Sequence, residues 1–206
     1  MEGESMLSHD QLQLKLRPAG FRLLAPLMGA GFGVRISEPV TLDVFLRESL
    51  GCSLEYIEKE LQTVLVDGRA VDRFEEVWVA DGSVVALSAA MPGLVGTTLR
   101  RGGHLAAMRK EISAAGQANR PDHTSEGMVR VKLFNVVARQ IGPRLMDCGV
   151  WLDGGRIADI ASFILAANAE LIPAATWNGN EVLPERLGDQ CRSGNWIQLM
   201  ATMLPE

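Results

Sequence analysis

Hydrophobic and polar residues alternate at two places in the chain, and each place begins a similar succession of elements. The runs LQLKLR from Leu12 and MVRVKLF from Met128 carry an apolar side chain at every second position. Period-two alternation is typical of a strand with one buried face. The pattern therefore predicts strands over residues 12–17 and 128–134.

A turn, a second strand and a helix are predicted after each of these strands. The proline-containing segments Ala25–Met28 and Pro143–Met146 are interpreted as the turns. The helices are indicated by apolar residues at helical spacing, which would lie on one face: Leu42, Phe45, Leu46 and Leu50 in the first half, and Ile157, Ile160, Ala161 and Ile164 in the second.

The two halves match best after the helix. TVLVDGRAV (63–71) corresponds to ATWNGNEV (175–182), and each is an apolar strand that runs into Asp-Gly or Asn-Gly. These dipeptides strongly indicate a hairpin, because they tolerate positive φ. DGSVVALSAAMP (81–92) then corresponds to SGNWIQLMATMLP (193–205). Repetition of the whole order predicts a duplication.

One helix for four or five strands predicts an α+β fold, in which a single main helix packs across a mixed sheet. This is the ubiquitin-like β-grasp arrangement, here predicted as two tandem domains. The segment 104–127 becomes rich in Gly, Asn, Pro, Asp and Ser and is interpreted as a linker. The predicted domains are therefore 1–103, with a glycine-ending tail, and 128–206, without one.

The stretch VLVDGRAVDRFEEVWVADGSVVALSAAMPGLVG resembles the second half of the MoaD/ThiS sulfur carriers. The shared pattern is a strand, a turn at Asp67-Gly68, a second turn at Asp81-Gly82, an apolar strand over 84–87, Pro92 and a glycine-ending tail. The resemblance covers residues 12–96 and extends more weakly over 128–206. It implies a carrier whose terminal glycine is adenylated by a partner enzyme and converted to a thiocarboxylate.

The glycines after the first half are candidates for such a tail. Gly102 and Gly103 would form a processed tail, while Pro92, Gly93 and Gly96 would contact a partner. However, Gly103 is followed by His104, so its carbonyl group belongs to an amide and cannot be adenylated without cleavage. The second half ends in MLPE, with no glycine. Gly102-Gly103 is therefore interpreted as part of the linker, and proteolytic processing remains the alternative.

Composition narrows the function further. The net charge is −5, which disfavours nucleic acid and favours a basic partner surface. No run approaches the roughly 20 apolar residues of a membrane span, and the polar start does not resemble a secretory signal. The three cysteines form no CxxC pair, which fits a reducing cytoplasm and gives no metal site. The three histidines fall in the predicted tail or linker, so no catalytic residues and no cofactor are predicted.

Cysteine and tryptophan offer further functional candidates. Cys52 lies beside Ser53, a predicted helix cap, and is interpreted as a small core residue rather than a reactive thiol. All four tryptophans lie in predicted strands, and Trp177 and Trp196 are the interface candidates because their neighbours are polar.

The sequence thus predicts a non-catalytic, ubiquitin-like protein that acts through protein–protein interaction in or near a sulfur-transfer or molybdopterin-type cofactor pathway. One alternative is a processed carrier or protein modifier ending at Gly103. Another is a tandem β-grasp protein that binds a small ligand.

Overall fold

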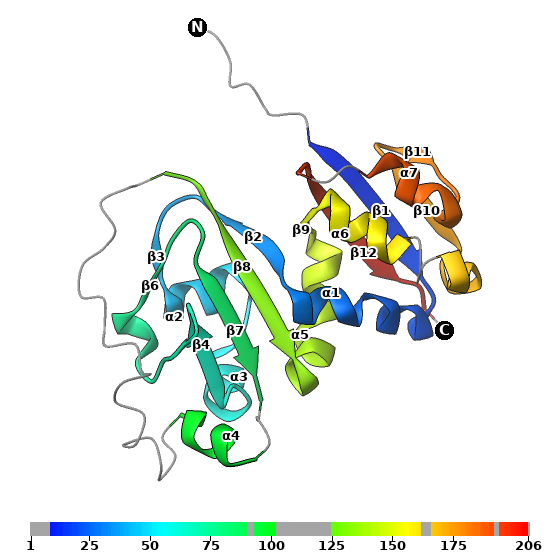
Figure 1. Cartoon of the computed structure of the whole chain (residues 1–206). Helices are drawn as coiled ribbons and strands as arrows, with labels where there is room; N and C mark the ends of the chain where they lie inside the picture. Colours follow the sequence, from blue (N-terminus) through cyan, green and yellow to red (C-terminus); the bar gives the residue numbers. More distant parts are fainter. Residues whose placement is uncertain (1–8, 90–92, 102–124, 162–165, 192–193, 206) are drawn as a thin grey trace, which may run out of the picture. The chain divides into compact units, whose positions relative to one another are not determined.

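The chain folds into two compact units that do not coincide with its two halves. The computed structural model describes residues 9–89, 93–101, 125–161, 166–191 and 194–205. Unit 1 combines residues 1–24 with 143–206, and unit 2 comprises residues 25–142 (Figure 1). No helix in these described ranges is long and apolar enough to cross a membrane.

Unit 2 contains a mixed sheet with the strand order β2-β8-β7-β4-β5. Its two central strands, β7 and β8, are parallel, and every other pairing is antiparallel. A separate two-stranded sheet pairs β3 with β6. The strand bounds are β2 Phe32–Ile36, β3 Val40–Thr41, β4 Thr63–Val66, β5 Arg69–Ala70, β6 Trp78–Val79, β7 Val84–Ser88 and β8 Gly127–Phe134.

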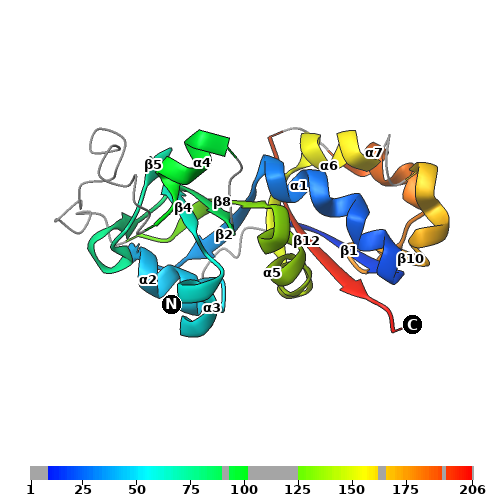
Figure 2. The ribbon, with the colours of Figure 1, turned by 90° about the horizontal axis from the view of Figure 1, so that it is seen from below.

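A helical segment covers one face of the unit 2 sheet (Figure 2). It runs from α2 (Leu42–Val44) through the π-helical turn η2 (Phe45–Ser49), and α3 (Leu54–Lys59) follows. The predicted apolar stripe is confirmed, since Leu42, Phe45, Leu46 and Leu50 are all fully buried. Unit 2 also contains α1 (Ala25–Ala30), the 3-10 turn η3 (Phe74–Glu76) and α4 (Gly93–Leu99).

Unit 1 contains a sheet with the strand order β9-β12-β1-β10-β11. The central strands β1 and β12 are parallel, and their neighbours run antiparallel. The apolar face of β1, with Leu12, Leu14 and Leu16, forms part of the buried core. The bounds are β1 Asp10–Leu16, β9 Val150–Asp153, β10 Ala174–Trp177, β11 Asn180–Glu181 and β12 Trp196–Met203.

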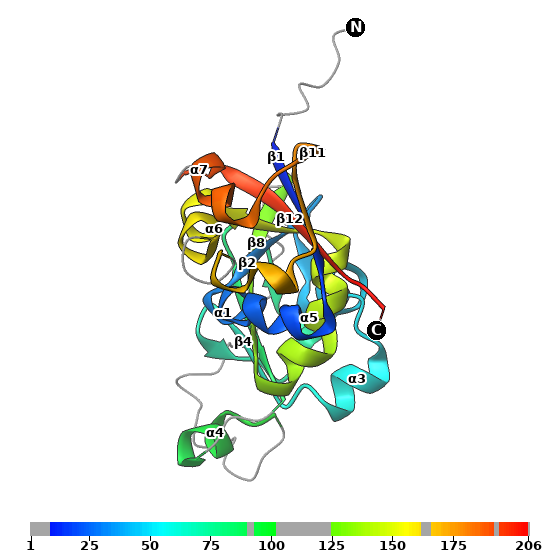
Figure 3. The same ribbon diagram turned by 90° about the vertical axis from the view of Figure 1, so that its right-hand side faces the viewer.

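Helices cover both faces of the unit 1 sheet. Figure 3 shows α6 (Gly154–Ile160) and α7 (Leu187–Gln190) on one side of β1 and β12. On the other side lies the part of α5 (Asn135–Cys148) that belongs to unit 1, residues 143–148. Three 3-10 segments complete the unit: η1 (Pro18–Leu24), η6 (Ala166–Leu171) and η7 (Pro184–Arg186). Ile157 and Ala161, from the predicted second helical stripe, are buried, while Ile164 lies outside the described residues.

Each sheet is completed by the first strand of the opposite half of the chain. β1 belongs to the first half but pairs with β10 and β12, and β8 belongs to the second half but pairs with β2 and β7. The compact units therefore differ from the consecutive segments 1–103 and 128–206 that the repeat suggested. The interpreted linker, 104–127, falls almost entirely outside the described residues.

The segments that lead out of these first strands are helical, contrary to the turns predicted at Ala25–Met28 and Pro143–Met146. The former lies in α1 and the latter in α5. Pro26 is the second residue of α1, where a missing N–H costs no helical hydrogen bond. Pro143 lies within α5, so here the surrounding fold overrides the usual helix-breaking tendency.

Both predicted hairpins are confirmed. β4 and β5 are joined by Asp67-Gly68, and β10 and β11 by Asn178-Gly179. All four turn residues have positive φ, at 51° and 79° in the first hairpin and 50° and 81° in the second. Asp and Asn tolerate this region better than other side chains, and Gly has no Cβ to clash.

Candidate functional site

The glycine-containing segment that follows β7 is helical and anchored to unit 2. Gly93 and Gly96, predicted to contact a partner as part of an extended tail, lie in α4, where Gly96 is buried. The Thr97 hydroxyl donates a hydrogen bond to the Gly93 carbonyl oxygen at 3.1 Å. Pro92 and the Gly102-Gly103 pair lie outside the described residues. The described part of this segment therefore differs from a free, extended carrier tail.

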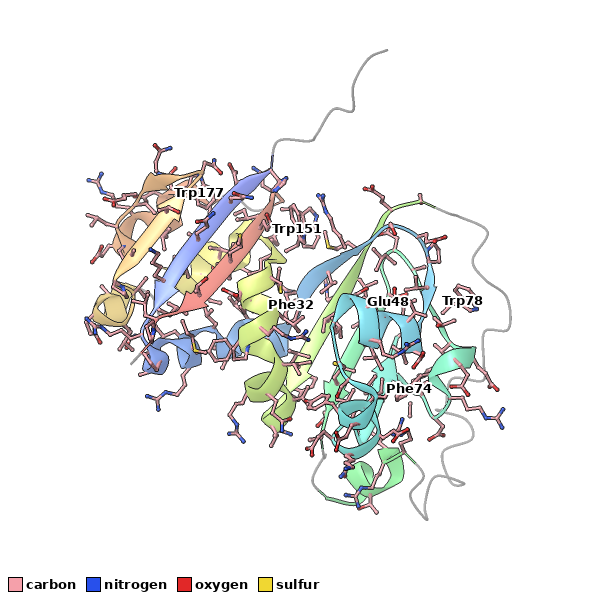
Figure 4. The ribbon with its side chains drawn as sticks, turned by 180° about the vertical axis from the view of Figure 1, so that it is seen from behind. Phe32, Glu48, Phe74, Trp78, Trp151 and Trp177 are labelled. Carbon is pink, nitrogen blue, oxygen red and sulfur yellow. The ribbon has the colours of Figure 1, made fainter. Side chains whose placement is uncertain are left out.

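Arg101 holds the end of this segment against unit 2. Its backbone N–H donates to the Gln62 carbonyl oxygen at 2.7 Å. Its Nη2 donates to the carbonyl oxygens of Ile57 and Glu58 at 3.1 and 3.3 Å. The guanidinium carbon lies 4.8 Å from the centre of the Phe74 ring, which is labelled in Figure 4. We call Ile57, Glu58, Gln62 and Phe74 the arginine seat.

The local chemistry of unit 2 explains why this position accepts a cation. Ser53 caps the start of α3 as predicted, and its hydroxyl oxygen accepts from the Tyr56 N–H at 3.1 Å. The other end of α3 presents carbonyl oxygens, which carry partial negative charge. The face of the Phe74 ring attracts the guanidinium in addition. Arg100 makes an exposed contact with the same seat, since its guanidinium donates to the Gln62 side-chain oxygen.

Unit 1 contains an open cleft of about 530 Å³ next to its own hairpin. Most of its lining residues are of apolar type, and Glu181 and Glu185 supply two exposed carboxylates. The lining includes no lysine or arginine, so its charge favours a cationic ligand. The ten lining residues of this unit 1 cleft are Ala169, Ile172, Pro173, Ala174, Ala175, Glu181, Val182, Leu183, Pro184 and Glu185.

The two tryptophans predicted to form an interface lie on opposite faces of the unit 1 sheet. Trp177 is the register partner of Leu12 and therefore shares its face. Leu199 also pairs with Leu12, and Trp196, three residues earlier on β12, points to the other face. Trp196 is 44 % exposed, whereas Trp177 is half-buried. Neither residue lines the unit 1 cleft.

A third tryptophan has an aromatic neighbour. Trp151, on β9 and labelled in Figure 4, is buried. It meets the His9 ring edge-on, with the two ring centroids 4.5 Å apart. Sequence patterns placed His9 in a tail, but it adjoins β1. The pairing of the two rings gives His9 a packing role in unit 1.

Two titratable groups have pKa values raised mainly by burial. Burial raises the pKa of the Tyr56 hydroxyl to about 12, with smaller contributions from Cys52 and Glu60. Burial also raises the pKa of the Cys191 thiol to about 11, with a smaller contribution from Asp10. Cys52 is buried in the core. Neither of the groups with raised pKa lines the unit 1 cleft.

The described residues hold no group of three or more His, Cys, Asp or Glu side chains that could bind a metal ion. Comparisons with protein families, curated proteins and solved structures found no match for this chain.

Sequence reasoning missed Arg101 and the two cleft glutamates. In the sequence, Arg100-Arg101 resembles an ordinary solvated pair, because the backbone carbonyls that accept from Arg101 and the Gln62 side chain that accepts from Arg100 lie some forty residues away. The matched hairpins offered a usable signal, since extending that match past Val71 and Val182 aligns Phe74 with Glu185. The structure shifts this alignment by one residue, since Phe74 begins η3 and Pro184, the neighbour of Glu185, begins η7.

Proposed function

We propose that this protein is a non-catalytic binding protein, built from two β-grasp-like units, that holds a protein partner in the unit 1 cleft. The cleft carries the proposal: its volume of about 530 Å³ is within the range of ligand-binding sites, and two carboxylates lie on a mostly apolar surface. Its lining offers no hydroxyl, thiol, imidazole or amine as a nucleophile. The ionisable side chains of the lining are the carboxylates of Glu181 and Glu185, whose negative charge supports a role in binding a cationic group.

The β-grasp interpretation is supported by the order of the strands. In unit 2, the parallel pair β7 and β8 lies between antiparallel strands, with a helical segment across one face. Unit 1 repeats this pattern of directions, but β12 takes the place that β8 has in unit 2, and β1 takes that of β7. The resemblance of residues 12–96 to the MoaD/ThiS carriers supports a partner from sulfur transfer or molybdopterin-type cofactor synthesis.

Site-specific photo-crosslinking in the native cell tests this function. A benzophenone amino acid replaces Leu183, a cleft residue that is 64 % exposed. The matched control replaces Leu54, which is 59 % exposed in unit 2 and lies outside the cleft. We expect a protein adduct from position 183 only, and we expect the purified partner to rebind the purified protein.

Charge reversal provides the second comparison. Glu181→Lys with Glu185→Lys should abolish the adduct at position 183. The same charge change at two exposed unit 1 residues outside the cleft, Glu170→Lys with Asp189→Lys, should leave it intact. The proposal would be contradicted if positions 183 and 54 gave equal adducts, or if the adduct at position 183 persisted after charge reversal. It would also be contradicted if the adduct were a small molecule or if no adduct formed.

A further inference from the structure

The arginine seat of unit 2 has a structural counterpart in unit 1. Val71 donates its N–H to the Val64 carbonyl oxygen at 2.9 Å, and Val182 donates to that of Ala175 at 3.0 Å. These bonds close the two hairpins in the same register, after turns of the same conformation. The two hairpins can therefore be compared position by position, and each is followed by a 3-10 turn, which begins at Phe74 in unit 2 and at Pro184 in unit 1.

The elements that border the seat and the cleft correspond in order. The seat lies between the end of α3 and η3, and the cleft lies between the end of η6 and η7. Leu61 and its counterpart Ile172 are both buried beside the first strand of each hairpin. Gln62, whose carbonyl oxygen accepts the Arg101 N–H, corresponds to Pro173 in the cleft lining. The same place is thus filled by Arg101 in unit 2 and open in unit 1.

The position of Phe74 shows how the unit 1 site differs. In unit 2, the Phe74 ring lies under the Arg101 guanidinium. Phe74 is the buried first residue of η3, and its counterpart in unit 1 is Pro184, the buried first residue of η7, which lines the cleft beside Glu185. A ring face and a carboxylate both attract a guanidinium, and the carboxylate also accepts hydrogen bonds from it. Glu181, on the opposite border, replaces Ala70 and adds a second negative charge. The seat and the cleft therefore both favour a cation, although different groups attract it.

Arg17 of unit 1 contacts the backbone beside the cleft without lining the cleft. Arg17 donates from its backbone N to the Leu171 carbonyl oxygen, and from Nε to that of Glu170, each at 3.0 Å. These carbonyls lie at the end of η6, and neither Arg17 nor its two partners lines the cleft.

We infer that the unit 1 cleft binds an arginine side chain from an extended segment of a partner protein, in the way that unit 2 binds its own Arg101. This inference rests on the proposed function and specifies the partner's chemistry. The guanidinium meets Glu185 and Glu181, and the backbone of the bound segment passes the strand end at Pro173. Arginine is favoured over lysine because a planar guanidinium donates to several acceptors at once.

Isothermal calorimetry on the full chain tests the inference with the peptide TTLRRGG, which copies residues 97–103 and is blocked at both ends. We expect one peptide per chain, because unit 2 already holds its own arginine. The variant with Glu181→Gln and Glu185→Gln should bind about fivefold more weakly. Glu170→Gln with Asp189→Asn, which removes equal charge outside the cleft, should bind like the wild type. TTLKKGG should bind about tenfold more weakly than TTLRRGG.

Binding that the cleft variant does not weaken would overturn the inference, as would equal affinity for TTLKKGG or no binding to the folded full chain. Two molecules bound per chain would also overturn it, since unit 2 would then be open too. Far-ultraviolet circular dichroism confirms the fold of each variant. A cleft-dependent partner crosslinked at Leu183 that contains no arginine in the bound segment would refute this inference and leave the proposed function standing.

Discussion

Tyr56 is the only tyrosine in the chain, so its titration can be observed directly. Its hydroxyl donates to the Gln140 side-chain oxygen at 2.9 Å, and burial raises its pKa to about 12. An unfolded chain loses this proton near pH ~10. The folded state thus keeps a proton that the unfolded state has lost, so stability should fall as pH rises from about 10 toward 12.

Tyrosinate absorbance of the native protein should therefore show a midpoint close to 12. In denaturant, the midpoint should return to about 10. Tyr56→Phe removes the signal and serves as the blank. A native midpoint near the denatured value would contradict the buried environment of this hydroxyl.

The three cysteines should be distinguishable by their reaction with a thiol reagent. Cys148 is exposed, Cys52 is buried, and burial raises the pKa of Cys191 to about 11. The thiolate is the reacting form, so the labelling rate of Cys191 should rise about tenfold per pH unit from neutral pH toward this pKa. Cys148 should react first at pH ~7, while Cys52 should react only on unfolding. Rapid labelling of Cys191 at neutral pH, assigned by loss in Cys191→Ser, would contradict this order.

At the scale of elements, sequence patterns predicted the features that depend on neighbouring residues in the chain. The Asp-Gly and Asn-Gly hairpins, the Ser53 cap and the buried stripe at Leu42–Leu50 all follow from short-range rules, and all are confirmed. The partner of each first strand could not be predicted in this way. LQLKLR and MVRVKLF alternate alike, so either strand presents an apolar face that could complete either sheet.

Contacts at the start of β8 help to fix it in unit 2. The Asp81 carboxylate accepts from the Met128 N–H at 2.8 Å, and Arg130 donates its N–H to the Ser83 carbonyl oxygen at 2.8 Å. A Cβ added at Gly127 would lie 2.8 Å from the Asp81 Cβ and 2.9 Å from its Cα. The backbone must therefore shift to admit a side chain.

Gly127→Ala should accordingly destabilise the protein by about 1–3 kcal/mol, measured by urea unfolding. Glu126→Ala, at the exposed neighbouring position, is the control and should change stability by less than about 0.5 kcal/mol. Equal stability of the two variants would show that β8 does not begin against Asp81.

At the scale of the whole molecule, the exchange of first strands determines which part of the chain can fold by itself. Residues 25–142 include every strand of unit 2, whereas residues 1–103 lack β8, one of its two central strands. A fragment of residues 25–142 should therefore unfold cooperatively in urea. A fragment of residues 1–103 should unfold without a cooperative transition, because β7 and β2 lose their shared neighbour. The opposite result would support two consecutive domains.

The candidate site, too, can be recognised only from the folded units. A repeat in the sequence indicates equivalent hairpins, but only the folded units show that Arg101 fills one equivalent position and that the other is open. The acidic net charge of −5 already favoured a basic partner, without locating the surface. The arginine seat could be located only in the folded unit, because folding brings the backbone carbonyls and the Phe74 ring together.

The most direct test is a titration of the isotope-labelled full chain with TTLRRGG, followed by amide chemical shifts. The account predicts saturable shifts centred on the unit 1 cleft, at Ala169, Ile172, Glu181 and Glu185, with the resonances around Arg101 unchanged. Shifts centred instead on Ile57, Gln62 and Phe74, or no saturable shifts at the cleft, would contradict it.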